Sequence, residues 1–181
     1  MRLYISIVSA LSRFVGIIAG LFLLSAVLSV SEMVFVRYVL NQSTVWQTEY
    51  TTYAIVAATF LGAPWVLIVR GHVNVDVLQI AAGPRVRLIM EALSGLAALI
   101  FIGLLSYAAW FHFEESLTNG WRSDTVWSVP LWIPTLPMLV GLVLLCLQYV
   151  AELMRLITEG IPTKDDEPTK LFDATVRSTG S

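Results

Sequence analysis

One stretch decides how this chain folds: residues 37–78, RYVLNQSTVWQTEYTTYAIVAATFLGAPWVLIVRGHVNVDVL. Its centre, from Tyr50 to Val69, is 20 residues long and carries no charge. A helix of that length measures about 30 Å, which is the thickness of the hydrocarbon core of a bilayer. Glu49 and Arg70 stand at its two ends. The stretch is therefore predicted to contain a membrane span with a polar boundary on each side.

The composition of the whole chain also predicts a membrane protein. Of the 181 residues, 57% are hydrophobic and only 13% are charged, which lies outside the range of ordinary soluble domains. The net charge of −2, without clusters of Lys and Arg, predicts no nucleic-acid partner. We expect an all-α protein surrounded by membrane lipids, since a helix satisfies its own backbone hydrogen bonds in a lipid environment.

Four apolar runs are long enough to cross a bilayer. They lie at about residues 14–36, 50–69, 88–111 and 131–157, and together they predict a four-span membrane domain over residues 1–157. The connections have room for short interfacial helices, and residues 71–84 fit either such a helix or an extension of the second span. Residues 158–181 are polar and are expected to form a disordered tail.

The first apolar run also has features of a cleavable signal peptide. It follows a basic start at Arg2 and carries the small residues Ser29 and Ser31 near its end. Its length, and the second run that follows closely, favour an uncleaved span. Within it, Gly16 and Gly20 form a GxxxG pattern, which allows another helix to approach closely.

Prolines predict irregular points in two of the spans. Pro64 has no N–H to donate to the carbonyl of Phe60, so we expect a kink near Phe60. Pro134 and Pro137 lie at the start of the fourth span, where they should bend the helix or delay regular helix until about Met138.

The basic residues are distributed unevenly between the two sides of a four-span arrangement. Nine of the 11 lie in the terminal segments and the 70–87 connection, and the other two, Arg37 and Arg122, lie in the 37–49 and 112–130 connections. By the positive-inside rule, both termini are expected in the cytoplasm. Five tryptophans then lie towards the outer face: Trp46, Trp110, Trp121, Trp127 and Trp132.

Neither a catalytic motif nor a cofactor motif is present in the sequence. GxxxxGK[ST], CxxC and HExxH are all absent, so an enzyme is not predicted. His72 and His112 would have to meet to ligate a haem, but four spans place them at opposite faces, about 30 Å apart. We therefore expect no cofactor and no metal in this chain. The central thirds of the spans hold few polar residues beyond Ser25, Thr59 and Cys146, which argues that a transport site lies in another subunit.

The most specific polar group follows the second span. His72 and Asp76 are four residues apart, hence on one face of a helix, and Asp76 can pair with Arg70 or Arg85. One interpretation is that these residues only set the topology, as basic residues on the inner side with a solvated acid. The other is a polar clamp that fixes the loop against the cytoplasmic surface of a partner.

A set of residues spread along residues 37–78 carries a further likeness. It consists of Arg37-Tyr38 with Asn41, Trp46 with Glu49, Phe60-Leu61-Gly62, and Arg70-Gly71-His72-Val73 with Asp76. In this order and spacing, within a four-span chain, the set resembles the small membrane subunit of tripartite ATP-independent periplasmic (TRAP) transporters, the DctQ-like or Q subunit. The resemblance is sharpest over about residues 32–80 and continues as hydropathy and topology to about residue 157.

That resemblance implies a static scaffold in a secondary transporter of a bacterial or archaeal inner membrane. A large subunit of elevator type would contain the substrate and sodium sites, so sodium is expected there and not in this chain. A periplasmic binding protein would deliver an organic acid, such as a carboxylate or a sialic acid, whose uptake is driven by a sodium gradient. The residues expected to contact partners are Glu49, Arg70, His72 and Asp76, with Trp46 and Trp121 facing the binding protein.

The sequence leaves two other functions open. One is a membrane-anchor subunit for electron transfer, which a lack of Soret absorbance in the purified chain would exclude as a haem protein. The other is an independent small transporter or channel, which uptake by the reconstituted chain alone would favour.

Overall fold

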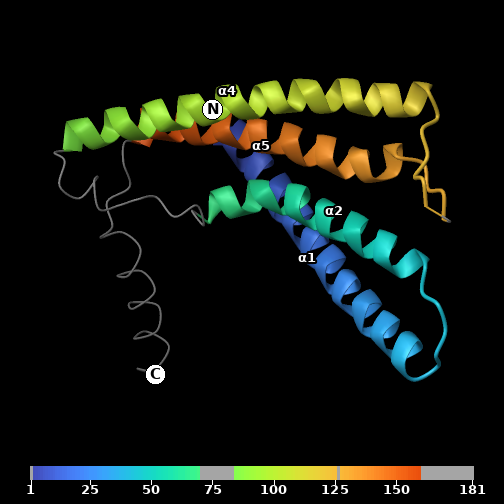
Figure 1. The fold of residues 1–181 in the computed structure, drawn as a ribbon. Coiled ribbons are helices and arrows are strands. Elements are labelled where there is room, and N and C mark those ends of the chain that lie inside the picture. Colours follow the sequence, from blue (N-terminus) through green and yellow to red (C-terminus); the bar gives the residue numbers. More distant parts are fainter. Residues whose placement is uncertain (1, 70–83, 126, 160–181) are drawn as a thin grey trace, which may run out of the picture.

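The fold was taken from a computed structural model, which describes residues 2–69, 84–125 and 127–159. Four helices make up its regular structure: α1 (Arg2–Tyr38), α2 (Trp46–Ile68), α4 (Pro84–Thr118) and α5 (Trp132–Glu159) (Figure 1). Each contains a stretch long and apolar enough to cross a membrane, and the described residues form no strand. The predicted all-α fold, with four helices long and apolar enough to span a membrane, is confirmed, while the side on which the termini lie stays a prediction.

Two of the helices extend well beyond the apolar runs that predicted them. α1 begins at Arg2, not near residue 14, and α4 runs from Pro84 to Thr118 where the apolar run covers about 88–111. The 37 residues of α1 make a helix about 55 Å long, nearly twice the hydrocarbon thickness of a bilayer. The ends of α1 therefore lie outside the hydrocarbon layer, or the helix crosses that layer at a tilt.

The prolines at the start of α5 do not delay the helix until Met138, and whether they bend it stays a prediction. α5 is helical from Trp132, and Pro134 lies in its first turn, where backbone amides have no partner within the helix to lose. Pro137 lies inside the helix. The Thr135 hydroxyl donates to the carbonyls of Leu131 and Trp132, at 3.0 and 3.1 Å, which satisfies carbonyl groups of this first turn.

Pro64 is likewise accommodated within a helix. Its side chain is buried, and α2 continues past it to Ile68. The kink expected near Phe60 therefore does not end the helix, and the size of the bend stays a prediction.

The helices form two antiparallel pairs. α1 packs along α2 and α4 packs along α5, while contacts between α2 and α5 join the pairs and α1 also touches α5 (Figure 1). Figure 1 shows α1 running obliquely away from α4 and α5 towards its C-terminal end. The packing of α2 against α5 is therefore the main contact between the two helix pairs.

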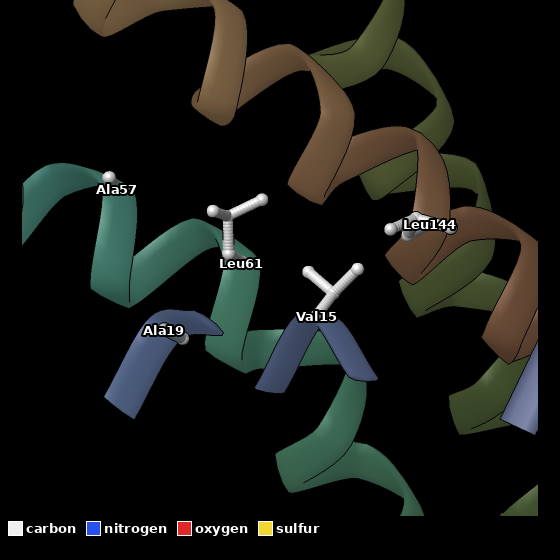
Figure 2. Close-up of a cluster of buried hydrophobic side chains, with 5 residues drawn as sticks. All are labelled: Val15, Ala19, Ala57, Leu61 and Leu144. Atoms are coloured by element: carbon white, nitrogen blue, oxygen red, sulfur yellow. The ribbon is translucent and has the colours of Figure 1, made fainter. Parts of the chain in front are cut away.

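The central core lies where α1, α2 and α5 meet. Its buried side chains are Val15, Ala19, Ala57, Leu61 and Leu144 (Figure 2). A second cluster joins α4 to α5 through Ile102, Ala109, Leu139 and Leu142. Both clusters contain alanine, and small side chains let helices approach closely enough for the van der Waals contacts that hold membrane bundles together.

One glycine of the GxxxG pattern makes the expected close helix contact. A Cβ atom at Gly16 would lie 2.8 Å from the Cβ of Trp65, so α2 packs directly on the backbone of α1 at this point. A Cβ atom at Gly20 would meet nothing within 4 Å. The pattern therefore serves the α1–α2 contact at Gly16 and not at Gly20.

Candidate functional site

Polar side chains gather at two places in the described structure. One place lies where the loop between α4 and α5 meets the start of α2. The other lies where α1 crosses α5. We call the first the loop clasp, formed by Glu49, Tyr53, Ser123 and Thr125. We call the second the α1–α5 contact, formed by the side chains of Tyr4, Ser12 and Gln148 with the backbone carbonyl of Leu147.

Glu49 is the centre of the loop clasp. Only 8% of its surface is exposed, and its Oε1 accepts a 2.6 Å hydrogen bond from the Tyr53 hydroxyl, one turn along α2. Its Oε2 accepts a hydrogen bond from the Thr125 hydroxyl in the loop. Among the described residues, no Lys or Arg lies within ion-pair distance of this carboxylate. The hydroxyl donors and the N-terminal end of α2 therefore stabilise its negative charge.

The loop itself, residues 119–131, is held by its own backbone. The Ser123 amide donates to the Val129 carbonyl and the Leu131 amide to the Trp121 carbonyl, both at 2.9 Å. These bonds close a short antiparallel bridge between the two arms of the loop. The hydroxyls of Ser123 and Thr125 share a further hydrogen bond of 2.9 Å. The loop is thus a narrow, internally bonded turn.

A glycine cap directs the chain from α4 into this loop. Gly120 has a φ of +61°, and the Trp121 amide donates to the Ser116 carbonyl at 3.2 Å. This is a Schellman cap, which suits glycine because a side chain at positive φ would be strained. The Ser116 side chain is fully buried, and its hydroxyl donates to the His112 carbonyl at 2.7 Å. The start of the loop is therefore anchored in the last turns of α4.

Aromatic rings lie around the clasp. The Trp46 ring at the start of α2 lies 6.2 Å from the Trp127 ring of the loop, centroid to centroid, and 6.2 Å from the Tyr50 ring. The Trp121 ring lies 6.3 Å from the His112 ring of α4. Trp46 and Trp121 keep 43% and 38% of their surface exposed. Both are thus accessible at the same end of the bundle.

Three of the six predicted contact residues can therefore be placed. Trp46 and Glu49 lie next to the loop that carries Trp121, although these residues are far apart in sequence. Arg70, His72 and Asp76 lie outside the described residues, so the predicted polar clamp stays a prediction.

The α1–α5 contact contains residues that the sequence did not single out. Ser12 and Gln148 are 0% and 1% exposed, and the Ser12 hydroxyl donates to the Gln148 Oε1 at 3.1 Å. Nearby, the Tyr4 hydroxyl donates to the Leu147 carbonyl at 3.2 Å. Gln148 lies in an apolar run, and an amide in a membrane span needs a polar partner. A polar glutamine within an apolar run was therefore the sequence feature from which this contact could have been predicted.

Two of the three mid-span polar residues that the sequence singled out, Ser25 and Thr59, are hydrogen-bonded within the bundle. The Ser25 hydroxyl donates to the Phe22 carbonyl at 2.8 Å and accepts from the Tyr50 hydroxyl at 3.0 Å. The Thr59 hydroxyl donates to the Ile55 carbonyl of its own helix at 2.8 Å. Residues 2–69, 84–125 and 127–159 contain no group of three or more His, Cys, Asp or Glu side chains able to hold a metal ion.

Comparison with known proteins places the chain in a family. Individual curated proteins give no match. The chain does match the family described as "Tripartite ATP-independent periplasmic transporters, DctQ component" over residues 26–159, which include the end of α1 and all of α2, α4, the loop clasp and α5. The resemblance carried by residues 37–78 is confirmed, and this multi-pass membrane protein belongs to the DctQ family, the small membrane component of TRAP transporters.

Proposed function

We propose that this chain is the scaffold-type small subunit of a TRAP secondary transporter that imports organic acids, such as carboxylates or sialic acids, with a sodium gradient. The observation that carries the proposal is the family match over residues 26–159. The working partners are a large elevator-type membrane subunit, which holds the substrate and sodium sites, and a periplasmic binding protein. This chain performs no catalysis and binds no cofactor of its own.

The hydrogen bonds of the polar side chains inside the described helices support the role of a scaffold. The hydrogen bonds of Ser12 with Gln148 and of Ser25 with Tyr50 each join two helices. The bond from Ser25 to the Phe22 carbonyl stays within α1. A carrier needs polar groups that face its substrate near the middle of the bilayer. The bonded polar side chains of this bundle instead stabilise the contacts between its helices.

The proposed location is the inner membrane of a bacterium or archaeon, with both termini in the cytoplasm. The distribution of basic residues supports this orientation, because nine of the 11 lie in the terminal segments and the 70–87 connection. The loop clasp then faces the periplasm.

Four polar residues are proposed to fix the ends of α2 and the surface that meets the large subunit: Glu49, Arg70, His72 and Asp76. Single alanine substitutions at these positions should reduce the recovery of the large subunit with a tagged small subunit. Unchanged recovery and unchanged uptake in all four variants would show that these residues only set the topology.

Reconstitution tests the function. The large subunit, this chain and the binding protein are placed in proteoliposomes with an inward sodium gradient, and uptake of a labelled organic acid is measured. Uptake should require all three proteins and should be lost when either membrane subunit is left out. Uptake by this chain alone would contradict the scaffold and indicate an independent transporter.

A further inference from the structure

The geometry points to Glu49 as a positioning residue: its carboxylate holds loop 119–131 in the shape in which the exposed side chains of the loop dock the periplasmic binding protein. This inference rests on the proposed function, because it assigns a place to one of the proposed partners. The first part of the inference, that Glu49 holds the loop, is testable on the isolated chain.

The clasp joins parts of the chain that are far apart in sequence. Glu49 and Thr125 are separated by 76 positions, and their hydrogen bond links the start of α2 to the loop between α4 and α5. The Trp46–Trp127 ring contact lies between the same two elements. These two contacts join the loop to the start of α2, and together with the backbone bonds within the loop they hold its shape. The bond to a carboxylate is charge-assisted and therefore the stronger type of hydrogen bond.

The loop presents residue types that commonly carry binding energy. Trp121, Arg122, Asp124 and Trp127 are all exposed on it, and Trp46 is exposed beside it. Tryptophan and arginine are enriched among the residues that dominate protein–protein affinity. A surface that is already ordered loses less conformational freedom on binding than a mobile one. A clasped loop is therefore better suited to docking than the same residues on a free loop.

Charge and predicted orientation together favour one kind of partner at this end of the bundle. The exposed acidic residues here are Glu32, Glu114, Glu115 and Asp124, and the exposed basic residues are Arg37 and Arg122. Four acids against two bases leave an excess of negative charge, which favours a partner with a basic surface. By the positive-inside rule this end faces away from the cytoplasm. A soluble protein on that side, the binding protein, is thus the occupant that fits.

Hydrogen exchange of the purified chain tests the clasp. Thr125→Val removes the loop hydroxyl that donates to Glu49, and we expect the Ser123 and Leu131 amides, which bond within the loop, to exchange roughly tenfold faster. Thr125→Ser keeps the hydroxyl and should restore slow exchange. Thr52→Val is the matched control, because within the described part of the chain the Thr52 hydroxyl bonds only to the Thr48 carbonyl of its own helix. Equal exchange in Thr125→Val and Thr52→Val would overturn the clasp.

Uptake by the three-protein system tests the docking. Thr125→Val should raise the binding-protein concentration at half-maximal uptake by roughly three- to tenfold, as expected for a weakened contact, while uptake at saturating binding protein stays unchanged. Trp121→Ala should raise it as well, and Thr52→Val should not. The large subunit should co-purify equally with every variant. A half-saturating concentration that does not change in Thr125→Val and Trp121→Ala would overturn the docking assignment.

A lipid role for the rings gives a different result. If Trp121→Ala leaves the half-saturating concentration unchanged, the ring serves the lipid headgroup region and the docking assignment is wrong. If the wild-type proteins give no uptake at all, the proposed function fails and the assigned partner fails with it. Hydrogen exchange still decides whether Glu49 positions the loop in that case.

Discussion

Gly141 of α5 lies directly against the backbone carbonyl of Phe60 in α2: a Cβ atom built at Gly141 would come within 2.3 Å of that oxygen. The same carbonyl would normally accept the amide of residue 64, which is proline and has none to donate. α5 therefore meets α2 at the turn whose hydrogen bond Pro64 removes. A glycine C–H can approach a carbonyl oxygen closely and make a weak hydrogen bond, which is common between packed helices.

Gly141→Ala should push α5 away from α2. The added methyl group meets backbone atoms, which cannot rotate away as a side chain can, so we expect a loss of about 1–3 kcal/mol in the free energy of unfolding. Denaturant-induced unfolding in detergent measures this loss. Gly20→Ala is the control, because a Cβ there meets nothing within 4 Å. Equal stability of the two variants would mean that the α2–α5 contact is not as close as described.

Ser12→Ala should weaken the contact between α1 and α5. The substitution leaves the buried Gln148 amide oxygen without its donor, and hydrogen bonds between membrane helices contribute about 0.6 kcal/mol on average and up to about 1.7 kcal/mol. The same unfolding measurement applies. Ser31→Ala serves as the control, since the exposed Ser31 hydroxyl bonds to the Val27 carbonyl of its own helix. A loss that is no greater than in the control would show that the interhelical bond contributes nothing.

Tyr53→Phe should distinguish the contributions of the two hydrogen bonds that Glu49 accepts from Tyr53 and Thr125. It removes the 2.6 Å bond within α2 but leaves the bond from Thr125 to the carboxylate. We expect a loss of about 1.5 kcal/mol in the free energy of unfolding, as for a bond to a charged group, with little change in hydrogen exchange of loop 119–131. Faster exchange of the loop in Tyr53→Phe would mean that both donors are needed to hold the carboxylate in place.

The orientation of the chain is testable with reporter fusions. Green fluorescent protein joined after Ser181 should fluoresce, and alkaline phosphatase joined at the same point should be inactive, because nine of 11 basic residues favour a cytoplasmic C-terminus. Alkaline phosphatase inserted after Asn119, in the loop between α4 and α5, should be active. The opposite pair of results would reverse the topology and move the loop clasp to the cytoplasmic side.

Apolar length alone determined the number and type of the helices. A run of about 20 uncharged residues such as Tyr50–Val69 has to satisfy its backbone hydrogen bonds within lipid, and a helix does so without any partner. Helix ends were less predictable, because α1 extends back to Arg2 through residues that are not uniformly apolar. The delay expected from Pro134 was wrong because the effect of a proline depends on where the first turn of α5 begins.

Contacts between helices were decided only by the tertiary structure. In sequence, Gly16 and Gly20 are equivalent halves of one pattern, yet the crossing of α2 over α1 places Trp65 on Gly16 and leaves Gly20 open. The loop partner of Glu49 is likewise set by packing, since Thr125 lies 76 positions away in sequence. The path of the loop that brings Thr125 to Glu49 depends on the Gly120 cap. Local composition determines whether a segment is a span, because solvation by lipid acts on each segment separately. Which side chains meet depends on the angle and register at which the spans cross, and no single segment carries that information.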